Sequence, residues 1–265
     1  MLTLIRGAGD LATGIALRLY RAGIEVVMTD VAKPTALRRT VAFCEAIRLG
    51  EMRVEDIYAR RAESVEDACA LLQEGIVPVL VDEDGTSIEK LRPQAVVDAI
   101  LAKRNLGTRI DMAPCVIGVG PGFTAGVDCH AVVETMRGHT LGRVIHEGSA
   151  LPNTGVPGMI GGYAAERVLH APCDGILQRG LPIGMQVCAG DTIAVIDGME
   201  MKTTIDGVLR GILPDGTRVF EGMKSADVDP RGVAEHCMSA SDKAFSVGGG
   251  VLEAILGITG ALKQK

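Results

Sequence analysis

The first 30 residues alternate between short apolar runs and a helical pattern. Residues 2–6 form an apolar, β-like run, and from Leu11 to Leu19 every fourth residue is apolar, which places these residues on one helical face. A second apolar run, residues 24–28, is followed closely by Asp30. The segment is therefore predicted to fold as a strand, a glycine-rich turn, a helix and a second strand.

The same alternation continues to about residue 119. Pro34 can open a helix, Gly75 can close one, and continuous apolar runs indicate buried strands. The predicted helices are residues 34–49 and 65–74, and the predicted strands are residues 77–81, 95–101 and 115–119. Strands separated by helices favour an α/β class with a largely parallel sheet. Residues 1–164 are accordingly predicted to form a Rossmann-like α/β domain.

The pattern changes after residue 164, where short β runs alternate with regular glycines. Two motifs recur with an offset of 32 residues. They are Asp174-Gly175-Ile176-Leu177 with Asp206-Gly207-Val208-Leu209, and Gly184-x-x-Val187-x-x-Gly190 with Gly216-x-x-Val219-x-x-Gly222. The constant offset indicates two copies of one β unit related by a pseudo-two-fold axis. Residues 165–228 are predicted to form a small all-β domain, and residues 229–265 a segment whose apolar helix packs back on the first domain.

Composition narrows the class of partner. The chain has 265 residues, 47% of them hydrophobic, and a formal net charge of −6. An acidic balance without a block of Lys or Arg argues against nucleic acid and anionic membranes as partners, and no apolar run is long enough to span a membrane. The seven cysteines are scattered and include no C-x-x-C pair, which favours reduced thiols in a cytoplasmic protein and no cysteine-based metal site.

The first candidate site is the turn Gly7-x-Gly9-x-x-Ala12 together with Asp30. Gly7 permits a tight turn, Gly9 lets the backbone approach a pyrophosphate, and the small Ala12 allows the helix to pack closely on the strand. The helix N-terminus supplies N–H groups and a partial positive charge. Asp30 would accept hydrogen bonds from a ribose, which favours NAD over NADP. Because the charge of Asp10 disfavours a phosphate in this turn, a Rossmann-like turn that binds nothing is the alternative.

The second candidate site begins with the loop Gly120-Pro121-Gly122, which follows a buried strand as phosphate cradles do. If residues 127–134 form a strand, Asp128, His130 and Glu134 share one face and could act as acid/base groups or hold a metal, although no dedicated metal site is expected. The alternative is a polar strand face bonded to loops. The basic residues that would neutralise a phosphate are Lys103, Arg104, Arg137 and Arg143.

The repeat region resembles the biotinyl/lipoyl barrel-sandwich hybrid domains. Ala171-Pro172-x-Asp174-Gly175 and the two G-x-x-V-x-x-G turns fall where that family has them. In biotin carriers the hairpin between the two halves presents Met-Lys-Met. Here the hairpin reads Met199-Glu200-Met201-Lys202, with Glu200 at the position of the modified lysine. Covalently bound biotin or lipoate is therefore not expected.

Across nearly its whole length the chain resembles the selenium-dependent molybdenum hydroxylase maturation proteins of the YqeB type. The motifs that carry this resemblance are Arg6-Gly-Ala-Gly-Asp-Leu-Ala-Thr-Gly14, Ala102-Lys-Arg-Asn105, Gly118-Val-Gly-Pro-Gly-Phe123, Asp128-x-His130, Glu134-Thr135-x-Arg137-Gly138-His139, Asn153-Thr-Gly155, Asp227-Val-Asp-Pro-Arg231 and Ser241-Asp-Lys243. The resemblance implies a cytoplasmic accessory protein for a molybdenum hydroxylase that needs selenium. It carries no catalytic residue over to this chain.

Three functions fit these features. The preferred one is an accessory factor that binds a nucleotide or the molybdenum (dinucleotide) cofactor through both glycine loops and assists cofactor insertion or selenium incorporation in a partner hydroxylase. The alternatives are an NAD-dependent oxidoreductase acting on a small molecule, with His130 and Lys103 as acid and base, and a non-catalytic scaffold whose β domain docks a partner. If the loops form one site, the Gly7–Ala12 turn and the Gly120–Gly122 loop should lie at the same carboxyl edge of the sheet.

Overall fold

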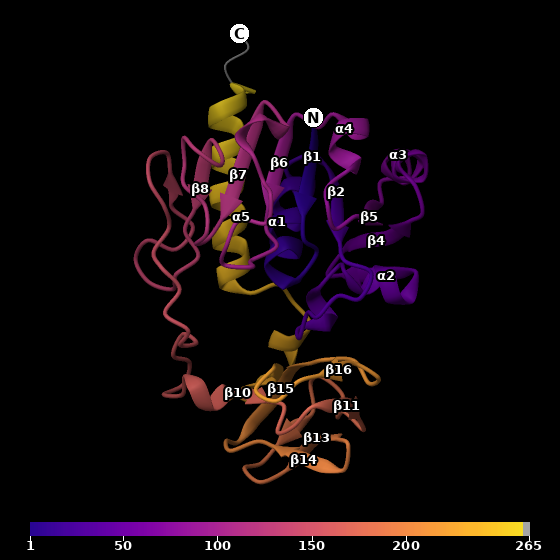
Figure 1. Ribbon diagram of the computed structural model, residues 1–265, viewed down its shortest axis with the longest axis vertical. Coiled ribbons are helices and arrows are strands. Elements are labelled where there is room, and N and C mark those ends of the chain that lie inside the picture. Colours follow the sequence, from indigo (N-terminus) through magenta and orange to yellow (C-terminus); the bar gives the residue numbers. More distant parts are fainter. Residues whose placement is uncertain (262–265) are drawn as a thin grey trace. The chain divides into compact units, whose positions relative to one another are not determined.

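The computed structural model describes residues 1–261, and the chain divides into two compact units (Figure 1). The first unit comprises Met1–Pro34, Ala42–Asn153 and the C-terminal segment that begins at Ala240. The second comprises Thr35–Val41 and Thr154–Ser239. Residues 35–41 are thus part of the second unit, although they lie within the first domain that the sequence predicts.

The first unit is built on a nine-stranded, mostly parallel sheet, which confirms the predicted α/β class. The strand order is β3-β4-β5-β2-β1-β6-β7-β8-β9. The β3–β4 and β8–β9 pairs are antiparallel and the other neighbours are parallel. The strands are β1 (Leu2–Arg6), β2 (Glu25–Asp30), β3 (Glu51–Val54), β4 (Ile57–Ala62), β5 (Val77–Val81), β6 (Ala95–Asp98), β7 (Cys115–Val119), β8 (Ala131–Val133) and β9 (Val144–Ile145).

Helix α1 (Asp10–Arg21) and the C-terminal helix α5 (Asp242–Thr259) lie side by side (Figure 1). Their contact depends on small residues. A Cβ atom added to Gly14 would lie 2.4 Å from the Cβ of Ala244, and one added to Gly248 would lie 3.0 Å from the carbonyl oxygen of Gly14. The predicted return of the C-terminal helix to the first domain is confirmed.

Helices α3 (Val65–Gln73) and α4 (Ser87–Leu91) pack on the other face of the sheet. Ile88 of α4 belongs to a buried cluster with Val132 of β8, whereas Gly250 of α5 approaches the neighbouring Val133. Because successive strand residues point to opposite faces, α4 and α5 cover opposite faces. The sheet is therefore buried on both sides, which explains its continuous apolar strands.

The helix predicted over residues 34–49 is wrong for most of its length. Only α2 (Glu45–Leu49) is α-helical there, and η1 (Arg39–Val41) is a short 3-10 turn within the second unit. The carbonyl oxygen of Leu37 accepts a hydrogen bond from the backbone N–H of Ile212 at 2.9 Å, and the Arg39 Nε donates to the Ile212 carbonyl at 2.7 Å. These distant partners satisfy polar groups of the segment, so it follows an irregular path instead of a helix.

The second unit is an all-β domain of two four-stranded antiparallel sheets, which confirms the predicted barrel-sandwich class. The sheets have the orders β10-β17-β15-β12 and β14-β13-β11-β16. Their strands are β10 (Val168–His170), β11 (Gly175–Gln178), β12 (Gln186–Val187), β13 (Thr192–Ile196), β14 (Met199–Lys202), β15 (Gly207–Ile212), β16 (Arg218–Val219) and β17 (Lys224–Asp229); the unit also contains the 3-10 turns η3 (Ala165–Arg167) and η4 (Ala234–Cys237).

The 32-residue repeat is visible in the pairing of these strands. Strands β10 to β13 correspond in order to β14 to β17, and each sheet takes two strands from each copy. Apolar side chains of both copies, among them Leu177 and Leu209, meet in one buried core. Neither copy could bury its apolar face alone, which is the physical reason for the duplication.

Within residues 1–261, no helix is both long enough and apolar enough to span a lipid bilayer.

Candidate functional site

The first unit presents the ends of five parallel strands at one edge of its sheet. Strands β1, β2, β6, β7 and β8 run parallel, so their carboxyl ends lie at the same edge. In the sheet, β1 lies between β2 on one side and β6 on the other, so the strand order changes direction at β1. A switch point of this kind is where open α/β sheets bind ligands. The Gly7–Ala12 turn follows β1 and the Gly120–Gly122 loop follows β7, so both glycine turns lie at this edge.

The loop after β6 contacts both glycine turns. A Cβ atom on Gly7, whose φ is +94°, would lie 2.7 Å from the carbonyl oxygen of Ala99. A Cβ atom on Gly122, whose φ is +114°, would lie 2.7 Å from the backbone nitrogen of Arg104. A Cβ atom on Gly120 would lie 2.8 Å from the Thr135 Oγ1. These glycines are needed for the packing of loops against one another, whether or not a ligand binds.

The N-terminus of α1 lies at this edge. Gly9 is the N-cap, has an extended backbone, and provides no side chain to cap the helix. Apart from the chain neighbours of Gly9, no atom of the described residues lies within 4 Å of the position that its Cβ would occupy, so there is space over this turn. Ala12, one turn further on, is buried. An uncapped N-terminus with space above it suits an anion such as a phosphate.

Asp30 at the end of β2 holds the first glycine turn in place. Its Oδ2 accepts a hydrogen bond from the backbone N–H of Ala8 at 2.7 Å, and its Oδ1 accepts one from Val31 at 2.8 Å. Burial raises the pKa of this carboxyl group, and the two backbone hydrogen bonds oppose that rise. The position matches that of a ribose-binding acidic residue, but the carboxylate is already engaged with the protein.

Helix α5 brings a lysine to the same edge. Since Gly14 contacts Ala244, the first turns of α1 and α5 lie next to each other. Ser241 caps α5 by accepting a hydrogen bond from the Ala244 N–H at 3.2 Å. The next residue but one, Lys243, is half-buried and forms no hydrogen bond or ion pair within residues 1–261. Burial and the charge of Arg137 lower its pKa, while Asp10 raises it.

Lys243 is a site residue that sequence reasoning missed. It stands in the Ser-Asp-Lys motif, which reads as an ordinary capped helix start. Only the packing of α5 on α1 places its ammonium group near the uncapped turn. A half-buried cation that has no partner among the described residues, beside a helix N-terminus without a side-chain cap, favours a negatively charged ligand.

The three acid/base candidates do not form a cluster. The strand that would align them is shorter than residues 127–134, because β8 covers only Ala131–Val133. The Asp128 carboxylate accepts hydrogen bonds from the Thr124 N–H at 2.8 Å and the Asn105 Nδ2 at 3.2 Å. The His130 Nδ1 accepts one from the Val116 N–H at 3.0 Å. Both side chains therefore hold loops and a strand edge.

Glu134 is also engaged with backbone groups. Its Oε1 accepts hydrogen bonds from the N–H groups of Thr135 and Met136 at 2.7 and 2.6 Å, and its Oε2 accepts one from Leu151 at 2.8 Å. Within residues 1–261, no group of three or more His, Cys, Asp or Glu side chains is placed to hold a metal ion. The geometry thus favours the structural alternative for this trio.

The predicted basic residues do not converge as a group. Lys103 and Arg104 are exposed in the loop after β6, and Arg143 is exposed before β9. Arg137 lies after β8 and forms a two-point ion pair with Asp242 at 2.9 and 3.2 Å. Of this set, Arg137 is the one whose charge acts on Lys243.

A buried network supports the loop between β6 and β7. Arg6 donates to the Thr108 Oγ1 at 2.6 Å and lies 3.6 Å from Asp98, which accepts a hydrogen bond from the same hydroxyl at 2.6 Å. Burial raises the pKa of Asp98. The sequence does not reveal this network, because Asp98 and Thr108 lie 92 or more positions after Arg6. The parallel pairing of β1 with β6 brings Arg6 beside Asp98.

A cavity of about 840 Å³ lies beside α4 in the first unit. It is lined by α4 and by the segments that precede β6 and β7, including Glu89, Arg92, Arg109 and Asp111. None of the site residues predicted from the sequence lines it. The carboxyl edge, with its open helix N-terminus and lysine, carries the stronger chemical argument.

The hairpin between the two repeats does not present a lysine at its turn, and Lys202 on the following strand is paired with Glu200. Asp197 and Gly198 form its two-residue turn, with positive φ values at both positions. The Lys202 ammonium lies 2.8 Å from the Glu200 carboxylate, which also accepts a hydrogen bond from Thr192. Met201 between them is buried.

Comparison with known sequences finds a relative that shares this whole segment. The chain is 53% identical over 255 residues to the uncharacterized protein YqeB of Escherichia coli (strain K12), an alignment that covers 96% of this chain. The chain spans about half, 47%, of that relative's length. It is therefore a close homologue of one portion of YqeB. No family model matches the chain.

Comparison with solved structures finds distant similarities. An aspartoacylase family protein from Mesorhizobium loti matches with 10% identity and a TM-score of 0.30, over 86% of this chain and 84% of that one. A succinylglutamate desuccinylase/aspartoacylase from Rhodobacter sphaeroides matches with 15% identity and a TM-score of 0.26, over 84% and 86% of the two chains. These values are too low for any argument about function.

Proposed function

We propose that the first unit binds a phosphate group of a nucleotide or dinucleotide at the N-terminus of α1. Two features at one edge carry the proposal. The start of α1 at Gly9 has no side-chain cap, and the half-buried Lys243 forms no hydrogen bond or ion pair with the residues that the structure describes. The helix N–H groups would bind phosphate oxygens, and the ammonium group would neutralise their charge. Asp10 limits the affinity, because its carboxylate repels a phosphate.

We further propose that the chain acts as an accessory factor for a molybdenum hydroxylase that needs selenium. The resemblance to the YqeB-type maturation proteins supports this role, and the similarity to YqeB extends over 96% of the chain. The nucleotide-bearing molybdenum cofactor would then be cargo, held by its phosphates at α1 and passed to the hydroxylase. In this role the residues of the carboxyl edge bind the cofactor and do not change it chemically.

Thermal unfolding with added ligands tests the binding step. NAD, NADP, mononucleotides and a pterin dinucleotide would each be added at about 100 times the expected Kd, where a binder stabilises the fold by about 2.7 kcal/mol. Lys243→Met keeps the apolar stem and removes the charge, and Lys90→Met removes the charge of an exposed lysine on α4 as a matched control. Circular dichroism is the readout, because the chain has no tryptophan.

We expect one nucleotide class to raise the Tm of the unmodified chain and of Lys90→Met but not of Lys243→Met. No shift with any of these ligands would refute nucleotide binding. A shift with NAD alone, together with hydride transfer to a small carbonyl compound, would replace the accessory role with the oxidoreductase alternative.

Deletion of the gene tests the accessory role separately. The hydroxylase from the deletion strain should lack activity and should regain it with the unmodified chain but not with Lys243→Met. Full hydroxylase activity in the deletion strain would refute the role in maturation, whatever the chain binds.

A further inference from the structure

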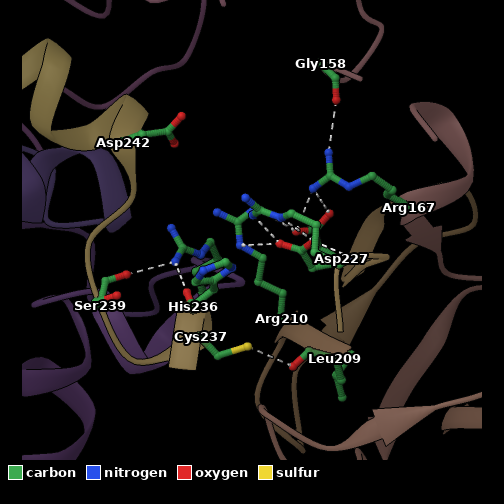
Figure 2. A network of polar contacts seen from close by, with 12 residues as sticks. Gly158, Arg167, Leu209, Arg210, Asp227, His236, Cys237, Ser239 and Asp242 are labelled. Atoms are coloured by element: carbon green, nitrogen blue, oxygen red, sulfur yellow. Dashed lines mark hydrogen bonds and ion pairs between the residues drawn. The ribbon is translucent and has the colours of Figure 1, made fainter. Parts of the chain in front are cut away.

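One sheet of the second unit carries charged side chains on a buried face. Arg167, Arg210, Asp227 and Asp229 are each less than 10% exposed. Figure 2 shows Arg167, Arg210 and Asp227 close together, and Arg210 lies within ion-pair distance of Asp229 as well. Arginine and aspartate are seldom buried to this degree without full pairing. The opposite face of the same strands, with Leu209 and Val228, belongs to the apolar core.

A β-bulge places Arg210 on the charged face. Along β17, Asp227 and Asp229 are two residues apart and therefore share a face. On β15, Leu209 pairs with Val228 and Gly211 with Asp227, so Arg210 is an extra residue without a strand partner. Bulges of this kind redirect a side chain and are common next to functional sites. Here the Arg210 guanidinium lies 3.8 Å from each of the two aspartates.

The two carboxylates are already hydrogen-bonded to other arginines. Asp227 accepts two hydrogen bonds from the Arg167 Nη2, at 3.1 and 3.4 Å. Asp229 accepts from the Arg231 Nε at 2.9 Å and from its Nη2 at 2.6 Å. The Arg210 guanidinium lies 3.8 Å from one carboxylate oxygen of Asp227 and of Asp229. Its side chain forms no hydrogen bond with any residue of the range 1–261.

Two arginine donors of this cluster are not satisfied. Among the described residues, the Nε groups of Arg167 and Arg210 are buried and have no hydrogen-bond partner, and the Arg210 Nε lies 3.8 Å from Asp229. An unsatisfied buried donor costs on the order of 1–3 kcal/mol, and more when it is charged. The positive charges also act on each other, since burial, Arg210 and Arg231 lower the pKa of Arg167. Both features favour the binding of an anion at these arginines.

We propose that this face is an oxyanion site in which Arg210 and Arg167 bind a phosphate group, either inorganic phosphate or a phosphate ester. A guanidinium offers its N–H groups in a planar fork that matches phosphate oxygens. A phosphate also carries close to two negative charges at neutral pH, which offsets the arginines. Arg231, whose side chain is 42% exposed beside the buried Asp229, marks the side on which solvent reaches the cluster. The proposal is independent of the site at α1.

Calorimetric titration of the full chain with inorganic phosphate tests this site, with AMP as a phosphate ester and the ionic strength held constant with chloride. Arg210→Gln removes the principal donor, and Arg210→Lys keeps the charge without the fork. Arg218→Gln, at an exposed position of β16 in the same unit, is the matched control. Phosphate should bind the unmodified chain and Arg218→Gln alike, and bind Arg210→Gln at least tenfold more weakly, with Arg210→Lys between them.

A second measurement covers the case in which Arg210→Gln does not fold. In ¹H–¹⁵N NMR spectra of the unmodified chain, phosphate should shift the Nε–H resonances of Arg210 and Arg167 and leave that of Arg218 in place. The proposal fails if neither inorganic phosphate nor AMP binds the unmodified chain, if Arg210→Gln binds them equally well, or if neither ligand moves those resonances. Shifts with AMP but not with inorganic phosphate would assign the site to an ester; the reverse would assign it to the free ion.

Discussion

The carboxylate of Asp30 accepts a hydrogen bond from the backbone N–H of Ala8 at 2.7 Å, across the first glycine turn. A dinucleotide-binding protein would use the acidic residue at this position for a ribose. Here the side chain also ties β2 to the turn that follows β1, so it stabilises the fold before any ligand binds.

Replacement of Asp30 by alanine should therefore destabilise the chain in the absence of ligand. The Ala8 and Val31 N–H groups lose their acceptor, and the free energy of unfolding should fall by about 1–3 kcal/mol. Urea denaturation followed by circular dichroism measures this, with the exposed Asp84→Ala as control. Unchanged stability of Asp30→Ala would show that water replaces the carboxylate at no cost.

Gly14 and Gly249 should respond in opposite ways to alanine. A methyl group on Gly14 would lie 2.4 Å from the Cβ of Ala244, so Gly14→Ala must separate α1 from α5, at a cost of about 1–3 kcal/mol. Gly249 is also helical but has no atom within 4 Å of its Cβ position, so Gly249→Ala should stabilise the chain by up to about 1 kcal/mol. Thermal unfolding of both variants checks the pair. Equal effects of the two substitutions would contradict the close contact of the helices.

Asp229 should make stability depend on pH in the acid range. Its hydrogen bonds from Arg231 lower its pKa from 3.8 to about 2 against the effect of burial. Because the folded pKa lies below the unfolded one, this stabilisation is complete above about pH 4 and is lost as the pH falls toward 2, a loss of about 2 kcal/mol. Urea denaturation between pH 5 and pH 2 measures it. Asp229→Asn should show a correspondingly smaller loss over this range, and an unchanged loss would exclude Asp229 as its source.

The cysteines should separate into reactive and protected groups. Cys69 and Cys188 are exposed, whereas Cys44 and Cys115 are buried. Burial raises the pKa of the Cys115 thiol to about 12 and raises that of Cys44 as well, so neither forms an appreciable thiolate at pH 8. Iodoacetamide followed by mass spectrometry should modify Cys69 and Cys188 in the folded chain and Cys44 and Cys115 only in urea. Rapid labelling of Cys44 in the folded chain would show that its helix opens readily.

Local patterns predicted many of the elements because their causes are local. The apolar spacing from Leu11 to Leu19 is that of a helix in any context, and α1 forms there. The run Cys115–Val119 is apolar throughout because both faces of the sheet are covered. The β3–β4 hairpin and α4 went unpredicted, since their short, polar sequences contain no comparable period.

The helix expected over residues 34–49 shows where local patterns are insufficient. Pro34 permits a helix start, but the hydrogen bond from Ile212 to Leu37 and that from Arg39 to Ile212 connect residues more than 170 positions apart. A propensity of a few tenths of a kcal/mol per residue is too small to outweigh such tertiary hydrogen bonds. The same limit applies to Asp128, His130 and Glu134, whose partners lie in loops that the pattern does not connect.

The sequence by itself determined the parallel α/β class, the position of the glycine turns and the duplicated β unit, because each depends on the order and spacing of residues along the chain. The tertiary structure alone decided that Lys243 lies beside the N-terminus of α1, that Asp30 is held by Ala8, and that a bulge directs Arg210 onto two aspartates already bound by other arginines. These relationships join residues that are distant in the chain. Their energies come from desolvation and from contacts that exist only when the units are folded.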